Sequence, residues 1–316
     1  MKLIKDIERG VFVINTLVNA FRANELFGCN RFPEDIMPED LEIGSNEHLL
    51  YLSFISSIAY LRKEERLWNL AKDAYEDNKD GIIFNPEKIL NSSINSVDKE
   101  LKKYGLLVNP LIVKQWNLSN PKSANRKILE GRDLEMWINM ALALKDFGSD
   151  VKKLCESFDF DGVKILEEFS LGKYSNCFPE YHKARKVILW MVRLQRYAKF
   201  KLKNLNKLPM PIGMHIIRAT FMSGAISGEV SSIMLDLYEI LSDYWYEVSH
   251  LEKNEFSLSP IEFQIYLWIL SKHGCSKGRR DHLICRLQDE CPLGEYCSEG
   301  VFKTLGTYIK VDTQQK

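Results

Sequence analysis

The apolar residues along most of the chain recur with the period of an α-helix. Over residues 49–75 they return mostly at steps of three and four, and the same spacing recurs over 133–147, 229–245 and 261–270. Gly148 follows the second of these stretches, where it can end the helix. Alternation typical of strands is nearly absent. We therefore predict an all-α fold.

Helix breakers divide this pattern into segments. Asn-Pro pairs stand at 85–86, 109–110 and 120–121, and residues 208–212 hold two prolines, which gives about ten helices. No repeat of fixed period indicates a solenoid. We expect an N-terminal helical extension at 1–44, a two-lobed helical domain at 45–270, a cysteine loop at 271–300 and a tail at 301–316. The polar end of the tail, from residue 311 onward, is expected to fray.

The composition is that of a soluble globular protein. The chain has 316 residues, of which 45% are hydrophobic and 11% aromatic. It lacks an apolar run long enough to span a bilayer and a secretory cleavage pattern near its start, so we expect a cytoplasmic protein without a membrane partner, nucleoid-associated if prokaryotic. Lys plus Arg and Asp plus Glu both number 43. Any nucleic-acid-binding face must therefore be local.

Four of the seven cysteines lie close together near the C-terminus. Cys275, Cys285, Cys291 and Cys297 fall within 23 residues, separated by nine, five and five residues. In a reducing compartment such a group indicates a metal site rather than disulfides, and four thiolates suit zinc or an iron–sulfur cluster. Zinc sites usually present their ligands as close pairs, and this spacing is wider. We predict a [4Fe-4S] cluster, with zinc, or four unligated thiols, as alternatives.

A second local feature is a basic stretch in the middle of the chain. Residues 170–207 hold ten Lys and Arg against the single acid Glu180. An apolar helical face runs from Val187 to Tyr197, so the basic side chains must project elsewhere. On this interpretation phosphates are contacted by Lys186, Arg193, Arg196 and Lys199. The alternative is a charged, solvated helix face.

Three segments carry a family resemblance, in the right order along the chain. Residues 50–76 look like a leucine-rich helix pair, and CFPEYHKARKVILWMV at 177–192 is similar to a Leu-Pro-Gly-x-Gly hairpin with a basic helix. LPMPIGMHIIRATFMSGAI at 208–226 is similar to a Pro-Val-Asp-Thr-His-Val-x-Arg segment. Together they resemble the helix-hairpin-helix DNA glycosylase superfamily, the endonuclease III and 8-oxoguanine glycosylase kin. The five-residue gap in CPLGEYC at 291–297 matches the last gap of the iron–sulfur members, whereas the first two gaps here are longer.

The resemblance implies a two-lobed monomer that binds double-stranded DNA, flips a damaged base and hydrolyses its N-glycosidic bond. Lys183 would be the catalytic lysine, and Tyr181 would act as a wedge in the duplex. Other basic residues at the end of the chain would add an edge beside the DNA: Lys277, Arg279, Arg280 and Arg286. The nucleic acid contacts that the resemblance implies come from Tyr181, His182, Lys183, Arg185, Lys186, His215 and Arg218.

Departures from the family pattern leave the chemistry open. The motif aspartate falls on Gly213, and the Schiff-base lysine aligns with Ala184, one residue from Lys183. The hairpin glycines are replaced by Glu180 and His182. Carboxylates outside the motif are Asp159, Asp161 and Asp236, each of which could instead cap a helix or face solvent. Three functions follow: a DNA glycosylase, a non-catalytic nucleic-acid-binding protein that kept the cluster, or a hydrolase of modified nucleosides.

Overall fold

The structure is a computed structural model. It describes residues 2–29, 31–60, 62–78, 82–107, 111–117, 120–129, 132–179, 183–251, 255–256, 258–276, 285–305 and 308–314. For residues 111–117, 120–129, 132 and 183 the description covers the backbone alone.

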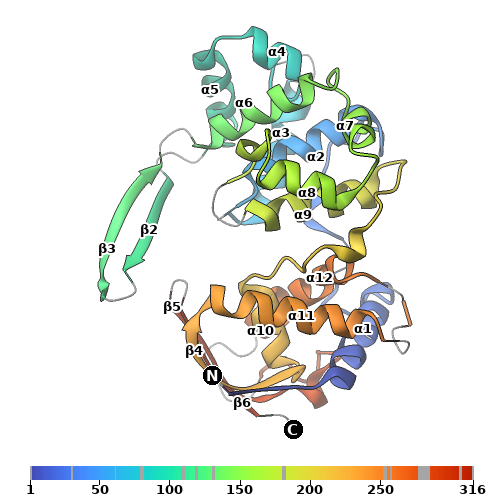
Figure 1. Cartoon of the computed structure of the whole chain (residues 1–316), viewed down its shortest axis with the longest axis vertical. Coiled ribbons are helices and arrows are strands. Elements are labelled where there is room, and N and C mark those ends of the chain that lie inside the picture. The colour runs from blue at the N-terminus through green and yellow to red at the C-terminus, as the bar shows by residue number, and fades with distance from the viewer. Residues whose placement is uncertain are drawn as a thin grey trace. The chain divides into compact units, whose positions relative to one another are not determined.

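Helices make up 59% of the structure, which confirms the helical prediction. The chain forms two compact units (Figure 1). The terminal unit combines both ends of the chain, Met1–Arg31 and Leu208–Lys316, and the central unit is the continuous segment Phe32–Lys207. These divisions fall at other points than the predicted boundaries at 44, 270 and 300.

The central unit is a group of helices with one hairpin. Its helices are α2 (Asn46–Ile58), α3 (Glu64–Asp77), α4 (Pro86–Asn91), α5 (Ile94–Lys103), α6 (Arg132–Lys145), α7 (Val151–Ser157), α8 (Gly162–Ser170) and α9 (Lys183–Tyr197). The hairpin consists of β2 (Leu111–Asn117) and β3 (Asn120–Leu129). Short 3₁₀ turns lie at Pro33–Asp35, Ser175–Cys177 and Leu205–Lys207.

Helix α2 is the centre of this unit. Nearly all of its side chains are buried, and it packs against α6 and α9. It begins where the Ser45 hydroxyl accepts a hydrogen bond from the His48 amide, an N-cap that sets its first turn. Two buried indoles find polar partners: Trp190 donates to the Ser53 hydroxyl at 2.9 Å and Trp137 to a backbone carbonyl at 2.9 Å. These aromatic rings are core residues rather than stacking platforms for a base.

The described part of the terminal unit contains four helices and a sheet, and α10 is the helix that contacts the strands. Its elements are β1 (Lys2–Lys5), α1 (Ile7–Arg22), α10 (Met214–Met222), β4 (Ile226–Ile233), α11 (Tyr238–Ser249), α12 (Pro260–Ile269), β5 (Glu299–Leu305) and β6 (Tyr308–Gln314). A π-helical segment, Leu270–Cys275, continues α12, and 3₁₀ turns lie at Met234–Leu237 and Gly294–Tyr296. Helix α10 contacts α12, the π-helical segment and three strands.

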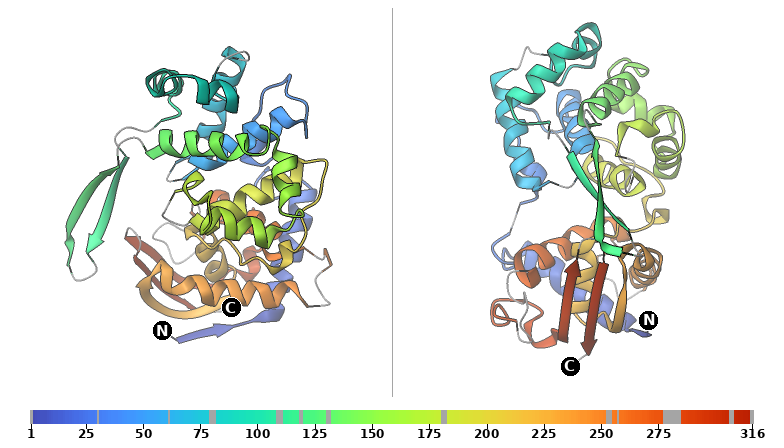
Figure 2. Two further views of the ribbon diagram at one scale, coloured as in Figure 1. Left: turned by 45° about the horizontal axis from the view of Figure 1, so that its top comes forward. Right: turned by 90° about the vertical axis from the view of Figure 1, so that its left-hand side faces the viewer.

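The four-stranded antiparallel sheet of this unit has the order β1-β4-β6-β5. Figure 2 shows β5 and β6 side by side in red. In β6 the side chains of Ile309, Val311 and Thr313 are buried and alternate with exposed ones, as a strand with one face on the core requires. The sheet joins the first residues of the chain to the last.

Three predictions are corrected by this sheet. The fold is mainly helical but not all-α. The stretch 229–245, predicted as one helix, begins in β4, passes through the turn Met234–Leu237 and becomes helical only in α11. Of the tail end expected to fray, residues 311–314 lie in β6, where ladder hydrogen bonds hold their backbone, and residues 315–316 lie outside the described residues. Helices α6, closed by Gly148, and α12 fall where they were predicted.

Candidate metal centre and nucleic-acid interface

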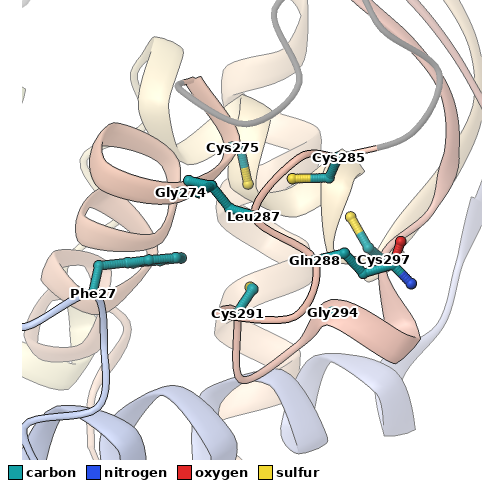
Figure 3. Close-up of a pocket in the computed structure, with 9 residues that line it drawn as sticks. All are labelled: Phe27, Gly274, Cys275, Cys285, Leu287, Gln288, Cys291, Gly294 and Cys297. Atoms are coloured by element: carbon teal, nitrogen blue, oxygen red, sulfur yellow. The ribbon is translucent and has the colours of Figure 1, made fainter.

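The four C-terminal cysteines line one cavity in the terminal unit (Figure 3). Their sulfurs point toward a common space from different parts of the loop. The cavity has an empty volume of about 260 Å³, counting the part open to solvent. Its walls are Phe27, Gly274, Cys275, Cys285, Leu287, Gln288, Cys291, Gly294 and Cys297.

Local backbone structure sets the direction of these sulfurs. Cys275 ends the π-helical segment, a type of distortion that is frequent at functional sites. Cys291 and Cys297 flank a tight turn, in which the Gly294 amide donates to the Cys291 carbonyl at 2.8 Å. Ser298 follows Cys297 directly, and its amide donates to the carbonyl of Met222 in α10 at 2.8 Å. The loop is therefore fastened to α10 directly after its last cysteine.

Two positions beside these cysteines require glycine, because a side chain there would collide with neighbouring atoms. A Cβ atom at Gly294 would lie 1.9 Å from the carbonyl oxygen of Gln288. A Cβ atom at Gly274 would lie 2.4 Å from the ring of Phe27, which closes one side of the cavity. Phe27 was not among the predicted site residues, because it is almost 250 residues away from Cys275 along the chain.

Inside the cavity the cysteines favour the neutral thiol over the negatively charged thiolate unless a bound cation balances the charge. Burial raises the pKa of Cys275 well above its ordinary value, the sulfurs of the other three cysteines raise it further, and the Arg218 guanidinium lowers it. Burial raises the pKa of Cys291 to about 11, and the Leu293 amide, which donates to the sulfur, lowers it. Metal ligation replaces the thiol proton, so these groups release protons when a metal binds.

The residues present fit a metal centre with sulfur ligands. The seven cysteines, all of them described, form no disulfide. Within the described ranges no group of three or more His, Cys, Asp or Glu side chains is arranged to hold a single metal ion. Four thiols around one cavity, one of them receiving a backbone N–H, fit the donor set of an iron–sulfur cluster and equally that of a four-cysteine zinc site.

The predicted motif segment lies beside this cavity. Gly213, at the position of the family's aspartate, is the N-cap of α10 and supplies no side chain. His215 is half-buried and its Nδ1 is 3.1 Å from the Ser271 hydroxyl. Arg218 is half-buried, with its guanidinium carbon 5.1 Å from the centre of the Phe302 ring. Against the effect of burial, the Arg218 guanidinium lowers the pKa of Cys275, and the Cys275 sulfur raises the pKa of Arg218. This proximity favours a role for Arg218 beside the cysteines over a phosphate contact.

The three carboxylates considered as substitutes for the motif aspartate have structural partners. Asp161 caps α8 by accepting a hydrogen bond from the Val163 amide at 2.8 Å. Asp159 pairs with Lys164 at the surface, and Asp236 accepts a hydrogen bond from Ser232. These contacts agree with the structural interpretation of all three residues.

The predicted hairpin contacts have mixed outcomes. Tyr181 and His182 lie outside the described residues, as do Lys277, Arg279 and Arg280. Lys183 begins α9, and its side chain is not described. Arg185 is half-buried on the same helix, and its nucleic acid contact stays a prediction. Arg286, at the surface of the cysteine loop, is exposed.

Lys186, predicted to contact phosphate, is engaged within the central unit, and its phosphate contact stays a prediction. Its ammonium donates to the carbonyl of Ala59, the C-cap residue of α2, and is held inside the central unit. Burial lowers its pKa to about 7, and the charge of Arg185 lowers it as well. The lysine satisfies a carbonyl that the helix itself leaves without a partner.

The other basic residues predicted on α9 are also engaged within the unit. Arg193 lies 3.8 Å from Glu34 and 3.6 Å from Glu64, and Arg196 pairs with Glu34. Lys199, beyond the end of the helix, pairs with Glu42 at 2.7 Å. Arg193, Arg196 and Lys199 therefore bind acidic groups of their own unit, and their joint contact with phosphates stays a prediction.

Replacement of Lys186 by methionine is expected to change how stability depends on pH. Between pH 7 and the ordinary lysine pKa near 10.5, the unfolded chain binds a proton that the folded chain does not, so wild-type stability rises with pH. The variant loses this rise, which is at most about 1.4 kcal/mol per pH unit. Urea unfolding at pH 7, 8 and 9 measures it. Lys199→Met, at an exposed lysine, should follow the wild type, and parallel pH profiles for Lys186→Met and wild type would contradict the assignment.

The chain matches no protein-family model, and neither the curated proteins nor the solved structures with which it was compared gave a match. In the described part of the chain, no helix has the length and apolar character needed to cross a membrane.

Proposed function

We propose that this protein binds double-stranded DNA as an iron–sulfur protein of the base-excision type, and that it does so without breaking the glycosidic bond. The proposal is carried by the contact between two segments that were each singled out separately in the sequence. The glycosylase-like segment, in α10, and the cysteine loop lie against each other in the terminal unit. Cys275, Cys285, Cys291 and Cys297 would hold the cluster, which supplies a cross-link between the segments that carry them.

The contacts of α10 support this combination. Arg218 is near Cys275, His215 is bonded to the π-helical segment that ends at Cys275, and the carbonyl of Met222 binds the loop after Cys297. The segment that resembles a glycosylase motif thus supports the cysteine site. A helix-hairpin-helix arrangement of the chain is part of the proposal, with α2, α3 and α9 as the elements that resemble it.

We expect no base release because the chain lacks a carboxylate at the position where the chemistry needs one. Hydrolysis of a glycosidic bond in this family uses a carboxylate at the motif position, and Gly213 has none. Asp159, Asp161 and Asp236 are held by Lys164, by the start of α8 and by Ser232. A carboxylate that caps a helix or pairs at the surface is a poor substitute for one placed against a sugar.

The test combines binding and base release on one preparation. Protein purified without oxygen is titrated against a labelled duplex at several salt concentrations, and the same protein is incubated with duplexes that carry different damaged bases. We expect an affinity that falls linearly with the logarithm of salt, and no released base.

Either measurement can overturn part of the proposal. A lack of binding at low salt removes the DNA-binding function. Base release that disappears in Asp159→Ala, Asp161→Ala or Asp236→Ala would make the protein a glycosylase with a relocated carboxylate. Inhibition of that release by free nucleosides would instead favour a nucleoside hydrolase.

A further inference from the structure

The outer face of the four-stranded sheet in the terminal unit is exposed. Along β6 every second side chain is buried against the unit, and the alternate ones face outward: Tyr308, Lys310, Asp312 and Gln314. Residues paired across an antiparallel ladder share a face, so the register arranges the outward residues of β4, β6 and β5 in rows. The other face is backed by α10, which contacts all three strands.

The first of these rows is apolar. Tyr308 lies between Ile233 of β4 and Leu305 of β5. Tyr308 is 41% exposed and Leu305 61%, whereas Ile233 is half-buried. The hydroxyl groups of Tyr308 and Ser231 are hydrogen-bonded, which holds the tyrosine ring against the sheet. An exposed ring between two apolar side chains is a surface on which a planar group can stack.

The second row is basic. Lys310 of β6 is directly opposite Lys303 of β5, and both side chains are exposed. Like charges in this position destabilise an antiparallel pair, and an anion beside both would turn their repulsion into attraction. Each lysine is two residues along its strand from the apolar row, a separation of about 7 Å. The charged groups are therefore within reach of a ligand that stacks on Tyr308.

The third row sets a limit to this basic surface. Asp312 of β6 pairs with Glu229 of β4, Lys2 of β1 pairs with the other side of Glu229, and Glu299 lies one row further along. All three carboxylate side chains are exposed. They repel phosphates, so a polyanion fits the part of the face before this row. We call that part the basic half of the sheet face, formed by Ile233, Lys303, Leu305, Tyr308 and Lys310.

We propose that the basic half of the sheet face binds single-stranded nucleic acid, with a base stacked on Tyr308 and phosphates beside Lys303 and Lys310. Stacking on aromatic side chains of a sheet, combined with positive charge along the backbone, is a general way of binding a single strand. In a duplex the faces of the bases are covered by their neighbours. The inference goes beyond the proposed duplex binding and depends neither on it nor on the metal centre.

The first test removes the stacking surface. Binding of short, fluorescently labelled thymidine and uridine strands to the full chain is measured by anisotropy. Tyr308→Ala should bind about ten-fold more weakly than the wild type, because base stacking is lost. Tyr308→Phe keeps the ring and should bind like the wild type. Equal affinity of Tyr308→Ala and wild type overturns the inference.

The second test changes the charge of the sheet face in both directions. Lys303→Gln/Lys310→Gln should reduce the slope of log affinity against log salt by about 1.4, since two phosphate contacts to a single strand are lost. Glu229→Gln/Asp312→Asn should instead strengthen binding. The matched control Lys152→Gln/Lys153→Gln makes the same charge change at exposed positions of α7 in the central unit and should keep the wild-type slope. Circular dichroism establishes that each variant is folded.

The remaining outcomes separate this inference from other partners and from the proposed function. Equal weakening by the lysine pairs of α7 and of the sheet overturns the assignment to the sheet face. Competition by polyglutamate as strong as by the unlabelled single strand would mean that the surface responds to negative charge alone, which also overturns it. If the same preparation binds duplex but no single strand, the inference fails and the proposed function survives. If it binds only the single strand, through Tyr308, the inference stands without the proposed function.

Discussion

Replacing Cys275 with serine is expected to remove the proposed iron–sulfur cluster from the protein. Cys275 is the most buried of the four cavity cysteines, with 8% of its surface exposed, and it is fixed by the π-helical segment that ends at it. A serine hydroxyl is a hard, weakly acidic donor and does not replace a thiolate toward iron. Wild type should contain about four iron and four sulfide per chain and absorb visible light. The variant should lose nearly all of both.

The matched control for this variant is Cys155→Ser. Cys155 is fully buried in α7 of the central unit, and burial raises the pKa of its thiol to about 12, but it does not line the cavity. Serine there disturbs a core without touching the proposed ligands, so iron and sulfide should stay at the wild-type level. Equal loss from both variants would contradict the assignment of ligands. A colourless wild-type protein with one zinc per chain would replace the cluster with the zinc alternative.

Loss of the proposed cluster should also lower the melting temperature of the terminal unit. The cavity is closed by parts of the chain far apart in sequence, Phe27 after α1 and the cysteines after α12. A group that binds the folded chain and not the unfolded one stabilises the folded state. The effect should be confined to signals of the terminal unit, such as the fluorescence of Trp245, which is buried there.

The features predicted correctly from the sequence are those with short-range signals. Helices α6 and α12 follow from periodic apolar residues over ten or more positions, and Gly148 adopts the left-handed φ of 68° that ends the first of them. The four cysteines are recognisable as a group because they lie close together in the sequence. That they line one cavity depends on how a loop folds back on α10, and spacing does not contain that information.

The missed strands had weaker signals. Tyr308–Gln314 alternates apolar or β-branched with polar residues, so β6 was open to prediction as a strand. β4 was harder, because Val230, Ile233 and Leu237 also fit a helical period. Pairing of β4 with β1 and β6, contributed by the two ends of the chain, decides its conformation. Tertiary pairing of this kind overrides local pattern.

For the basic stretch, too, the sequence lacks the long-range information. Its charges were compared only with neighbours in sequence, where Glu180 is the single acid. The acids that neutralise it come from much earlier in the chain: Glu34 and Arg196 are 162 residues apart. Counting charges in a sequence segment identifies an excess of basic residues. Only the fold shows whether their side chains reach solvent or pair with distant acids.

Replacing Glu34 with glutamine should destabilise the central unit strongly. The side chains of Glu34 and Arg193 are 4% and 6% exposed, and Glu34 also pairs with Arg196. Glutamine keeps the shape and removes the charge, which leaves two guanidinium groups close together without their shared counter-ion. Breaking a buried pair in this way costs about 3 kcal/mol or more, because the remaining charge stays desolvated. For a unit of this size the melting temperature should fall by roughly 6–12 °C.

The comparison that isolates burial is Glu42→Gln. Glu42 and Lys199 are also an ion pair linking the start of the central unit to the end of the basic stretch, but their side chains are 72% and 69% exposed. Water and salt screen that pair, so its loss should leave the melting temperature within error of the wild type. Raising the salt concentration should not rescue Glu34→Gln, since its cost is desolvation rather than surface repulsion. Equal shifts for the two variants would mean that Arg193 and Arg196 can reach solvent, and the basic residues of α9 would again be available to bind phosphate.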